Sequence, residues 1–309
     1  MFFSNVDNYM IIKYNSAEEK SVMAIPDFKK DHTERHSRLS EAQIDNIFDK
    51  ASVYDLSGTL RNGGSVIFPH STIEVSGIYT AAAVNACLDS GADRVLVIGV
   101  LHALTDEMNE ARIRVANGGR PEDEELWGVQ GPGLNGRREW ESEFSLLNFL
   151  FLWNIAVRRR GIEHPELIMR YPYLAGGRPE AMPGIGELED IALKAAAIVA
   201  TTDPFHHGVG YGDKPENSFY PETGGLDLGR RRIREGLDIL ERADHPAYNR
   251  HCVEAKSDGR DAGQVLRHLL GPVKAEILDI VSDDMTEMYG GVSPTWVAGA
   301  LIELKRTGK

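Results

Sequence analysis

Short apolar runs alternate with helix-period segments along most of the chain, and each type of run predicts one kind of element. Apolar runs of strand length lie at residues 65–69 and 94–99, at the start of 167–177, and at 198–202, 275–282 and 296–304. Segments with helical spacing lie at residues 40–51, 76–90, 143–161, 186–197, 226–243 and 262–270. This alternation predicts an α/β fold, a single-domain sandwich with a central, mostly buried sheet flanked by helices.

The clearest unit of this pattern runs from residue 65 to residue 99. The strand SVIFP is followed by an alanine-rich helix that Gly91 ends, and then by the strand RVLVIG. A strand, helix and strand in close succession form a crossover between parallel strands. We therefore expect these two strands to be parallel within one sheet.

Two segments stand apart from the alternation. Residues 1–62 are polar and mixed in charge around one capped helix at 40–51, which predicts an N-terminal extension that packs on a main domain of residues 63–309. The stretch 118–136 is rich in glycine and proline. Long loops in compact domains are often lids, so this stretch predicts a surface lid over a site.

The net charge of the chain limits the classes of partner that it is expected to bind. The 309 residues carry a formal charge of −13 and are 42% hydrophobic. Phosphate binding requires a clustered basic face, so we expect no nucleic-acid partner for this acidic chain. The arginine runs at 158–160 and 230–232 lie in mixed-charge, helical contexts and predict solvated faces.

Cysteine usage and the N-terminus bear on the compartment. Cys87 and Cys252 are far apart and form no CxxC motif, which favours a reducing compartment over a disulfide framework. The N-terminal stretch lacks the basic start, long apolar segment and cleavage site of a secretory signal. No stretch reaches the ~18 to 20 apolar residues of a membrane span. These features predict a soluble, cytoplasmic protein with no membrane contact, with a homo-oligomer among the open alternatives.

Three histidines follow predicted strands directly. His70 comes after SVIFP, His102 after RVLVIG and His206 after IVATT. In open α/β sheets, ligands bind outside the carboxyl ends of parallel strands, so the three imidazoles should meet at one edge of the sheet. Each of them alone would be an ordinary structural or surface histidine, and it is their convergence that predicts a shared site.

The loop AKSDGRDAG supplies candidate carboxylates. Asp261 stands directly before the helix predicted at 262–270 and is explained as its N-cap, whereas Asp258 is less needed for capping. Two neutral histidines and one carboxylate, with positions left open, form the ligand set of non-haem Fe(II) oxygen-activating enzymes. Zinc hydrolases can use the same set.

Five segments in register resemble the conserved blocks of the Memo-like family. FPHSTIEVSGIYTAAAV is similar to PHAGY-x-YSG, IGVLHALT to LGPSHH, and TTDPFHHG to SSDFxHxG, while SDGRDAGQVL is similar to CGRHPIGVL and WVAGALIEL to YAAGAL. The resemblance covers residues 65–304 in order. It implies the fold that Memo-like proteins share with class III extradiol dioxygenases of the protocatechuate 4,5-dioxygenase type.

The resemblance also implies roles for individual residues. His70 and His102 match the two histidine ligands of a metal, and His206 matches the histidine that serves as acid and base in the dioxygenases. The third family position is a cysteine in Memo proteins and aligns here with Asp258, which moves the site toward the carboxylate of the oxygenases. Cys252 is the competing third ligand, although it lacks the Gly-Arg that follows the family cysteine.

Departures from the family blocks mark the expected substrate pocket. The block EHSIE is EFSLL here, so Phe144 and Leu147 replace a histidine and a glutamate, and PHAGY is PHSTI, which places Ser71 beside the first ligand. We expect Ser71, Glu143, Phe144 and His207 to line a pocket that is more apolar than in the family. A changed substrate is the simplest consequence.

These residues lead to three hypotheses for the function. The first is an Fe(II)-dependent dioxygenase that uses O2 to cleave a catechol-like or related small aromatic substrate in the extradiol manner, with His206 moving protons and Asp203 orienting its imidazole. The second is a zinc-dependent hydrolase with the same ligands, and copper is a further candidate metal. The third is a non-catalytic, Memo-like peptide-binding or redox protein.

Overall fold

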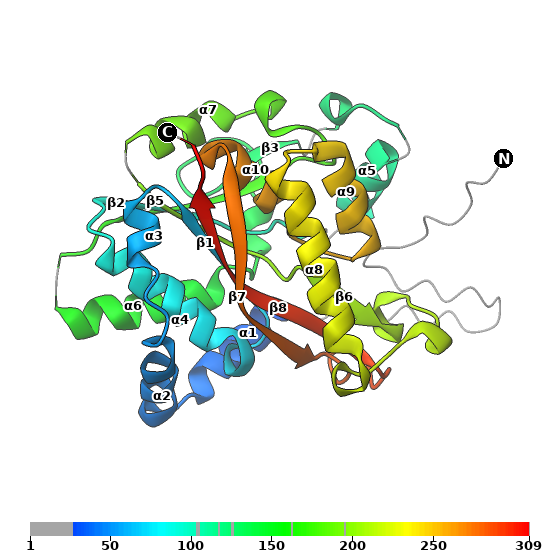
Figure 1. Ribbon diagram of the computed structural model, residues 1–309, viewed down its shortest axis with the longest axis horizontal. Coiled ribbons are helices and arrows are strands. Elements are labelled where there is room, and N and C mark those ends of the chain that lie inside the picture. The colour runs from blue at the N-terminus through cyan, green and yellow to red at the C-terminus, as the bar shows by residue number, and fades with distance from the viewer. Residues whose placement is uncertain are drawn as a thin grey trace.

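A mixed sheet lies at the centre of the protein (Figure 1) in a computed structural model that describes residues 27–102, 106–116, 118–124, 127–161, 163–194 and 196–308. The strands of the described residues are β1 (Ser65–Phe68), β2 (Arg94–Ile98), β3 (Gly128–Gln130), β4 (Glu166–Tyr173), β5 (Ala197–Thr201), β6 (Phe205–Gly208), β7 (Val273–Asp284) and β8 (Thr295–Arg306). They lie in the order β3-β4-β2-β5-β1-β8-β6, and β7 pairs with β8 outside this path.

The inner strands of the sheet are parallel. β5 lies between β1 and β2 and pairs parallel with both, so that Val199 is the partner of Val66 on one side and of Val97 on the other. The prediction that β1 and β2 are parallel is confirmed, although the two strands are separated by β5. β8 pairs antiparallel with β1, β6 and β7. The carboxyl ends of β1, β2 and β5 therefore point the same way.

Helices cover both faces of this sheet. They are α1 (Phe28–Arg38), α2 (Glu41–Ala51), α3 (Ser57–Arg61), α4 (Ile73–Asp89), α5 (Asp106–Ala116), α6 (Leu147–Arg160), α7 (Ile185–Leu193), α8 (Gly225–Glu241), α9 (His245–Glu254) and α10 (Arg260–Leu270). Short 3₁₀ turns lie at Pro121–Asp123, Glu139–Ser142, Pro179–Ala181, Val209–Tyr211, Pro215–Asn217 and Pro221–Thr223. Figure 1 shows α4 and α6 on one side of the sheet and α8 and α9 on the other.

Two apolar cores fill the space between the sheet and these helices. Phe68 of β1 packs toward α4 and α6 and stacks on Phe149 of α6, with 5.3 Å between ring centroids. Its neighbour Ile67 belongs to the other core, together with Leu266 of α10. Successive residues of a strand face opposite sides, so a strand buried on both faces has no polar positions. The expected α/β arrangement of a mostly buried sheet with flanking helices is confirmed.

The N-terminal segment contains more structure than its sequence indicated. Ser40 forms the expected capping box with Gln43 at the start of α2. α1 and α3 were not predicted, because α1 has a single buried residue, His32, and therefore shows no apolar stripe. Both helices pack on α4, and α1 also contacts α6. Residues 1–26 lie outside the described residues, so the boundary of the proposed extension at residue 62 stays a prediction.

Several predicted element boundaries were wrong. The helix expected from residue 143 begins at Leu147, because the backbone of Glu143 is extended, with ψ 151°. α10 begins at Arg260 with Gly259 as its N-cap residue, so Asp261 lies in the first turn and is not the N-cap. The stretch 118–136 is not only a loop, since it contains the edge strand β3, which pairs with β4.

A membrane span finds no support in the fold. Among the helices of the described chain, none is both long and apolar enough to cross a bilayer.

The turn after β6 depends on a glycine, which yields a test of the fold. Gly208 has φ +109°, and a Cβ built on it would lie 1.9 Å from the carbonyl oxygen of Pro294. We expect Gly208→Ala to lower the free energy of unfolding by about 3 kcal/mol, because both the strain and the clash involve backbone.

Urea denaturation with matched m-values measures this change. Gly186→Ala is the control, since Gly186 lies in helix α7 with no atom within 4 Å of the added methyl group. That substitution should be neutral or stabilise the fold by up to about 1 kcal/mol. Equal effects of the two substitutions would contradict the role of Gly208.

Candidate metal centre

His70 follows β1 at the carboxyl edge of the sheet, and its ring orientation is set by a threonine. Its Nδ1 lies 3.0 Å from Oγ1 of Thr201, while the same hydroxyl donates its proton to the carbonyl of Phe68 at 2.9 Å. The hydroxyl has one proton, so it must accept from His70. Nδ1 of His70 therefore carries hydrogen, and Nε2 is left with its lone pair for the site.

His102 follows β2 and is oriented in the same manner by a buried carboxylate. Its Nδ1 lies 2.9 Å from both oxygens of Glu143, whose Oε2 also accepts the backbone N–H of His102 at 3.3 Å. An ionised carboxylate only accepts hydrogen bonds, so Nδ1 is the donor to Glu143, and Nε2 is the nitrogen that faces Asp258. A carboxylate behind a histidine is the usual support of a metal-binding imidazole.

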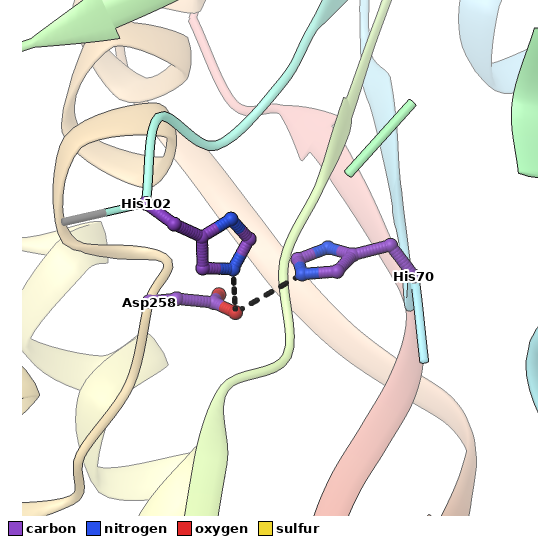
Figure 2. A group of neighbouring side chains, drawn as sticks. All are labelled: His70, His102 and Asp258. Atoms are coloured by element: carbon purple, nitrogen blue, oxygen red, sulfur yellow. Dashed lines mark ion pairs between the residues drawn. The ribbon is translucent and has the colours of Figure 1, made fainter. Parts of the chain in front are cut away.

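Asp258 joins the two histidines from a distant part of the chain. Its Oδ2 lies 3.2 Å from Nε2 of His70 and 3.6 Å from Nε2 of His102, and Figure 2 shows the three side chains entering from separate segments and pointing toward one another. Oδ1 accepts the backbone N–H of Asp203 at 2.8 Å. Oδ2 is buried and makes no hydrogen bond within the described part of the chain.

The charges of this group favour a cation between its members. Burial alone would raise the pKa of the Asp258 carboxyl, but the imidazoles hold it far below its usual value. Burial alone would lower the pKa of His102, but Glu143 and Asp258 raise it to about 10. A divalent ion that replaced the proton on Nε2 would satisfy the same carboxylates, since metal binding at histidine releases protons.

The residues present fit a metal ion. The candidate ligand atoms of His70, His102 and Asp258 lie within 4.8 Å of one another. Two nitrogen donors and one carboxylate oxygen suit Fe(II) or Zn(II) and leave coordination positions open. Oδ2 of Asp258 and the two Nε2 atoms supply all three donors once protons on Nε2 are released, with no change at the Nδ1 hydrogen bonds.

Cys252, the competing third ligand, lies elsewhere. It is buried on α9 in a separate cavity that Tyr248, His251 and Ile302 also line. Burial raises the pKa of its thiol to about 12, so the thiolate that a metal requires is disfavoured there. The geometry therefore supports Asp258 over Cys252 as the third candidate ligand.

His206 reaches the same group from β6, an element that the sequence did not indicate. Its Nε2 lies 4.0 Å from Oδ2 of Asp258, and its ring packs edge-on against Tyr211 at 4.8 Å. Its Nδ1 is buried with no hydrogen-bond partner among the described residues. Burial lowers the pKa of His206 to about 4 despite the nearby Asp258, so the imidazole is neutral at pH 7.

Asp203 does not orient His206 as expected. Its Oδ1 accepts the backbone N–H of His70 at 3.2 Å, and its Oδ2 lies 3.8 Å from Nε2 of His70. Burial raises the pKa of Asp203 to about 6, against the effect of His70. The carboxylate therefore holds the segment that carries the first candidate ligand, because the turn after β5 points it toward β1 rather than along β6.

His207 points away from the group, since neighbouring residues of a strand face opposite sides. Its Nδ1 lies 3.1 Å from Oδ2 of Asp213, and its Nε2 accepts the backbone N–H of Phe219 at 3.0 Å. Asp213 also pairs with Lys256, two residues before Asp258. His207 thus belongs to a network that ties β6 to the loop of Asp258, and not to the expected substrate pocket.

A cavity opens onto His70 and His102. Ser71 and Phe144 line it as expected, whereas Glu143 lies behind His102 and is outside the lining. The described residues of 118–136 do not line this cavity, so the lid expected there is not found over it. The rest of the lining is Phe28, His32, His70, Thr72, His102, Asp203, His206, Tyr211, Met285, Met288, Tyr289 and Val297.

The wall residues on α1 were missed by sequence reasoning. Phe28 and His32 lie one turn apart and both face the cavity. Their spacing of four residues was the available signal, but the polar surroundings hid it. Asn148 of α6 anchors α1 through His32 and His36, at 3.2 and 2.7 Å from its Oδ1.

Comparisons with known proteins do not extend these observations. No protein-family model matches the chain, and a search of curated proteins finds no match. The resemblance to the Memo-like family therefore stays a prediction that rests on the quoted blocks. The functional argument rests on the geometry of the side chains.

Metal binding by these side chains can be tested directly. We expect His70→Ala and Asp258→Ala to weaken Zn²⁺ or Co²⁺ binding by at least roughly 100-fold, because each removes a donor, and Glu143→Gln to weaken it by roughly 10- to 100-fold. Isothermal titration calorimetry of the full chain measures the dissociation constants.

Cys252→Ser is the matched control, since it changes a buried side chain of a different cavity. Its affinity for the metal should equal that of the unchanged protein. Full affinity in Asp258→Ala would place the third ligand elsewhere.

Proposed function

We propose that the protein is a non-haem Fe(II)-dependent dioxygenase that uses O2 to cleave the ring of a catechol-like or related small aromatic substrate in the extradiol manner. The observation that carries the proposal is the convergence of two imidazole Nε2 atoms on the buried Oδ2 of Asp258, which makes no hydrogen bond within the described residues. The resemblance of five sequence blocks to the Memo-like family supports it, together with the fold that this family shares with class III extradiol dioxygenases.

The walls of the cavity suit a flat, apolar substrate. Phe144 stacks on His102 with 4.4 Å between centroids and packs edge-on against His70 at 6.0 Å. Met285 and Tyr289 also line the cavity. A ring bound in this cavity with adjacent hydroxyl groups toward His70 and His102 would exclude water from them.

A ferrous ion held by His70, His102 and Asp258 would supply open positions at which a chelating substrate and O2 bind side by side. Hydrogen bonds at the Nδ1 atoms hold the two imidazoles in the orientation that a metal ion would require. Thr201 and Glu143 each accept from an Nδ1–H, so neither imidazole can turn or exchange its tautomer without breaking a buried hydrogen bond.

His206 is the candidate acid and base. Its imidazole is neutral at pH 7, and its Nε2 lies on the ligand side of the cavity, 4.0 Å from Oδ2 of Asp258. A substrate hydroxyl in the cavity could therefore pass its proton to Nε2 and receive it back later. Tyr211 packs against the ring and restricts its movement.

Two alternatives use the same residues. A zinc-dependent hydrolase would employ the same donors, and a non-catalytic Memo-like binding protein would need only the cavity. Aromatic and methionine walls favour a flat apolar ligand over the polar acyl or phosphoryl groups on which hydrolases act. Convergent, buried metal donors are not needed by a protein that only binds peptides.

Oxygen consumption is the decisive measurement. We expect protein reconstituted anaerobically with Fe(II) to consume O2 with catechols or aminophenols, and to form ring-opened products that contain both oxygen atoms of ¹⁸O2. Zinc-loaded protein is the control and should be inactive, because Zn(II) has no redox chemistry. Iron-loaded protein that consumes no O2 across the panel would contradict the proposal.

The role of His206 gives a separate test. We expect His206→Ala to retain Fe(II) affinity and to lose turnover by roughly 10²- to 10⁴-fold, the usual contribution of a general acid or base. His207→Gln is a comparison on the same strand, since its side chain points away from the cavity. Loss of iron from His206→Ala to the extent seen in His70→Ala would instead make His206 a ligand.

A further inference from the structure

Helix α1 forms the wall of the cavity that faces the candidate ligands. Phe28 stacks on Phe144 with centroids 4.8 Å apart and an angle of 18° between rings, and Phe144 stacks in turn on His102. His32, one turn further along α1, lies 5.3 Å from Phe144 and also lines the cavity. A substrate ring bound in this cavity would therefore come close to His32.

The tautomer of His32 follows from the hydrogen bonds of Asn148. Nδ2 of Asn148 donates to the carbonyl of Ser71 at 2.7 Å and to Oγ of Ser76 at 3.1 Å. These two bonds identify the atom beside Ser71 and Ser76 as the amide nitrogen, so the acceptor Oδ1 faces the histidines of α1. Nδ1 of His32 and Nε2 of His36 must both carry hydrogen to bond to it.

His32 consequently offers the cavity an acceptor. Its proton-bearing Nδ1 is committed to Asn148, and burial lowers the pKa of its imidazole to about 4, which keeps the ring neutral at pH 7. The nitrogen left for the cavity is Nε2, with a lone pair and no hydrogen. Such an atom accepts a hydrogen bond from a hydroxyl or amine and repels a carboxylate, which has only lone pairs to offer.

The charged side chains near the cavity also disfavour a carboxylate on the ligand. Asp203 lines the cavity and Asp258 lies 3.2 Å from Nε2 of His70, while Glu143 lies behind His102. Within the described residues, no lysine or arginine lines the cavity. When the chelating pair of the ring faces the metal ion, a carboxylate elsewhere on the ring would lose its water with no lysine or arginine of the lining beside it.

We infer that the site takes an aromatic diol or aminophenol whose ring carries an additional hydrogen-bond donor instead of a carboxylate, and that His32 is the specificity-determining residue that accepts from this donor. The inference rests on the proposed function, because it assumes that the chelating pair of the ring faces the candidate ligands. In this inference α1 selects among such rings, although this helix lies outside the main domain that the sequence predicts.

The test compares ligands of nearly equal size in the absence of turnover. Isothermal titration calorimetry of the full chain loaded with Zn²⁺ gives dissociation constants for 3,4-dihydroxybenzyl alcohol and 3,4-dihydroxybenzoate, and for the corresponding 2,3-isomers. We expect the alcohol of at least one isomer pair to bind roughly tenfold more tightly than its benzoate, the scale of one hydrogen bond. Equal binding within both pairs, tighter binding of the benzoates, or no binding at all would overturn the inference.

Two matched variants assign the preference to His32. His32→Leu and His36→Leu each remove one hydrogen bond from Oδ1 of Asn148, but His36 does not line the cavity. The ratio between alcohol and benzoate should fall to within roughly threefold in His32→Leu and remain unchanged in His36→Leu. An unchanged ratio in folded His32→Leu, checked by circular dichroism, would overturn the role of His32.

The wild-type ratio tests the ligand preference even if a variant fails to fold. A preference that His32→Leu abolishes would support the inference even if iron-loaded protein consumed no O2. In that case only the dioxygenase proposal would fail.

Discussion

The structure of the site depends on one buried carboxylate oxygen. Oδ2 of Asp258 has no hydrogen bond among the described residues and lies between the Nε2 atoms of His70 and His102. Removing a carboxylate from water costs several kcal/mol unless a cation compensates it. The imidazoles around it lower its pKa, which shows that the surroundings stabilise its charged form. A bound metal ion would meet the same requirement with fixed geometry.

The sheet makes this arrangement possible because it brings distant segments to one edge. β1 and β2 both pair with β5, so the segments that follow them emerge on the same side. Thr201 at the end of β5 and Glu143 before α6 then fix the two imidazoles through their Nδ1 atoms. The candidate base and the wall of the cavity come from elsewhere, namely from β6 and α1.

The side chains around the candidate ligands have support roles that their sequence positions did not reveal. Asp203 and His207 flank His206 closely in the chain, yet one bonds to the backbone of His70 and the other to Asp213. Both contacts depend on the direction of a turn and on the alternation of side chains along β6. Such directions are set by pairing with β8, which is almost ninety residues away. Local sequence carries no information about them.

The sequence by itself determined the α/β alternation, the parallel inner strands and the meeting of His70 and His102 at one edge of the sheet, because apolar periodicity and positions after strands are local properties of the chain. Asp258 was indicated by the resemblance to the Memo-like family, with Cys252 as its alternative. It did not indicate α1, whose one buried residue is His32, or the short strand β6 that carries His206. Only the tertiary structure decided which nitrogen of each histidine is free and which helix closes the cavity. Those features depend on hydrogen bonds to Thr201, Glu143 and Asn148, which distant segments bring into place when the chain folds.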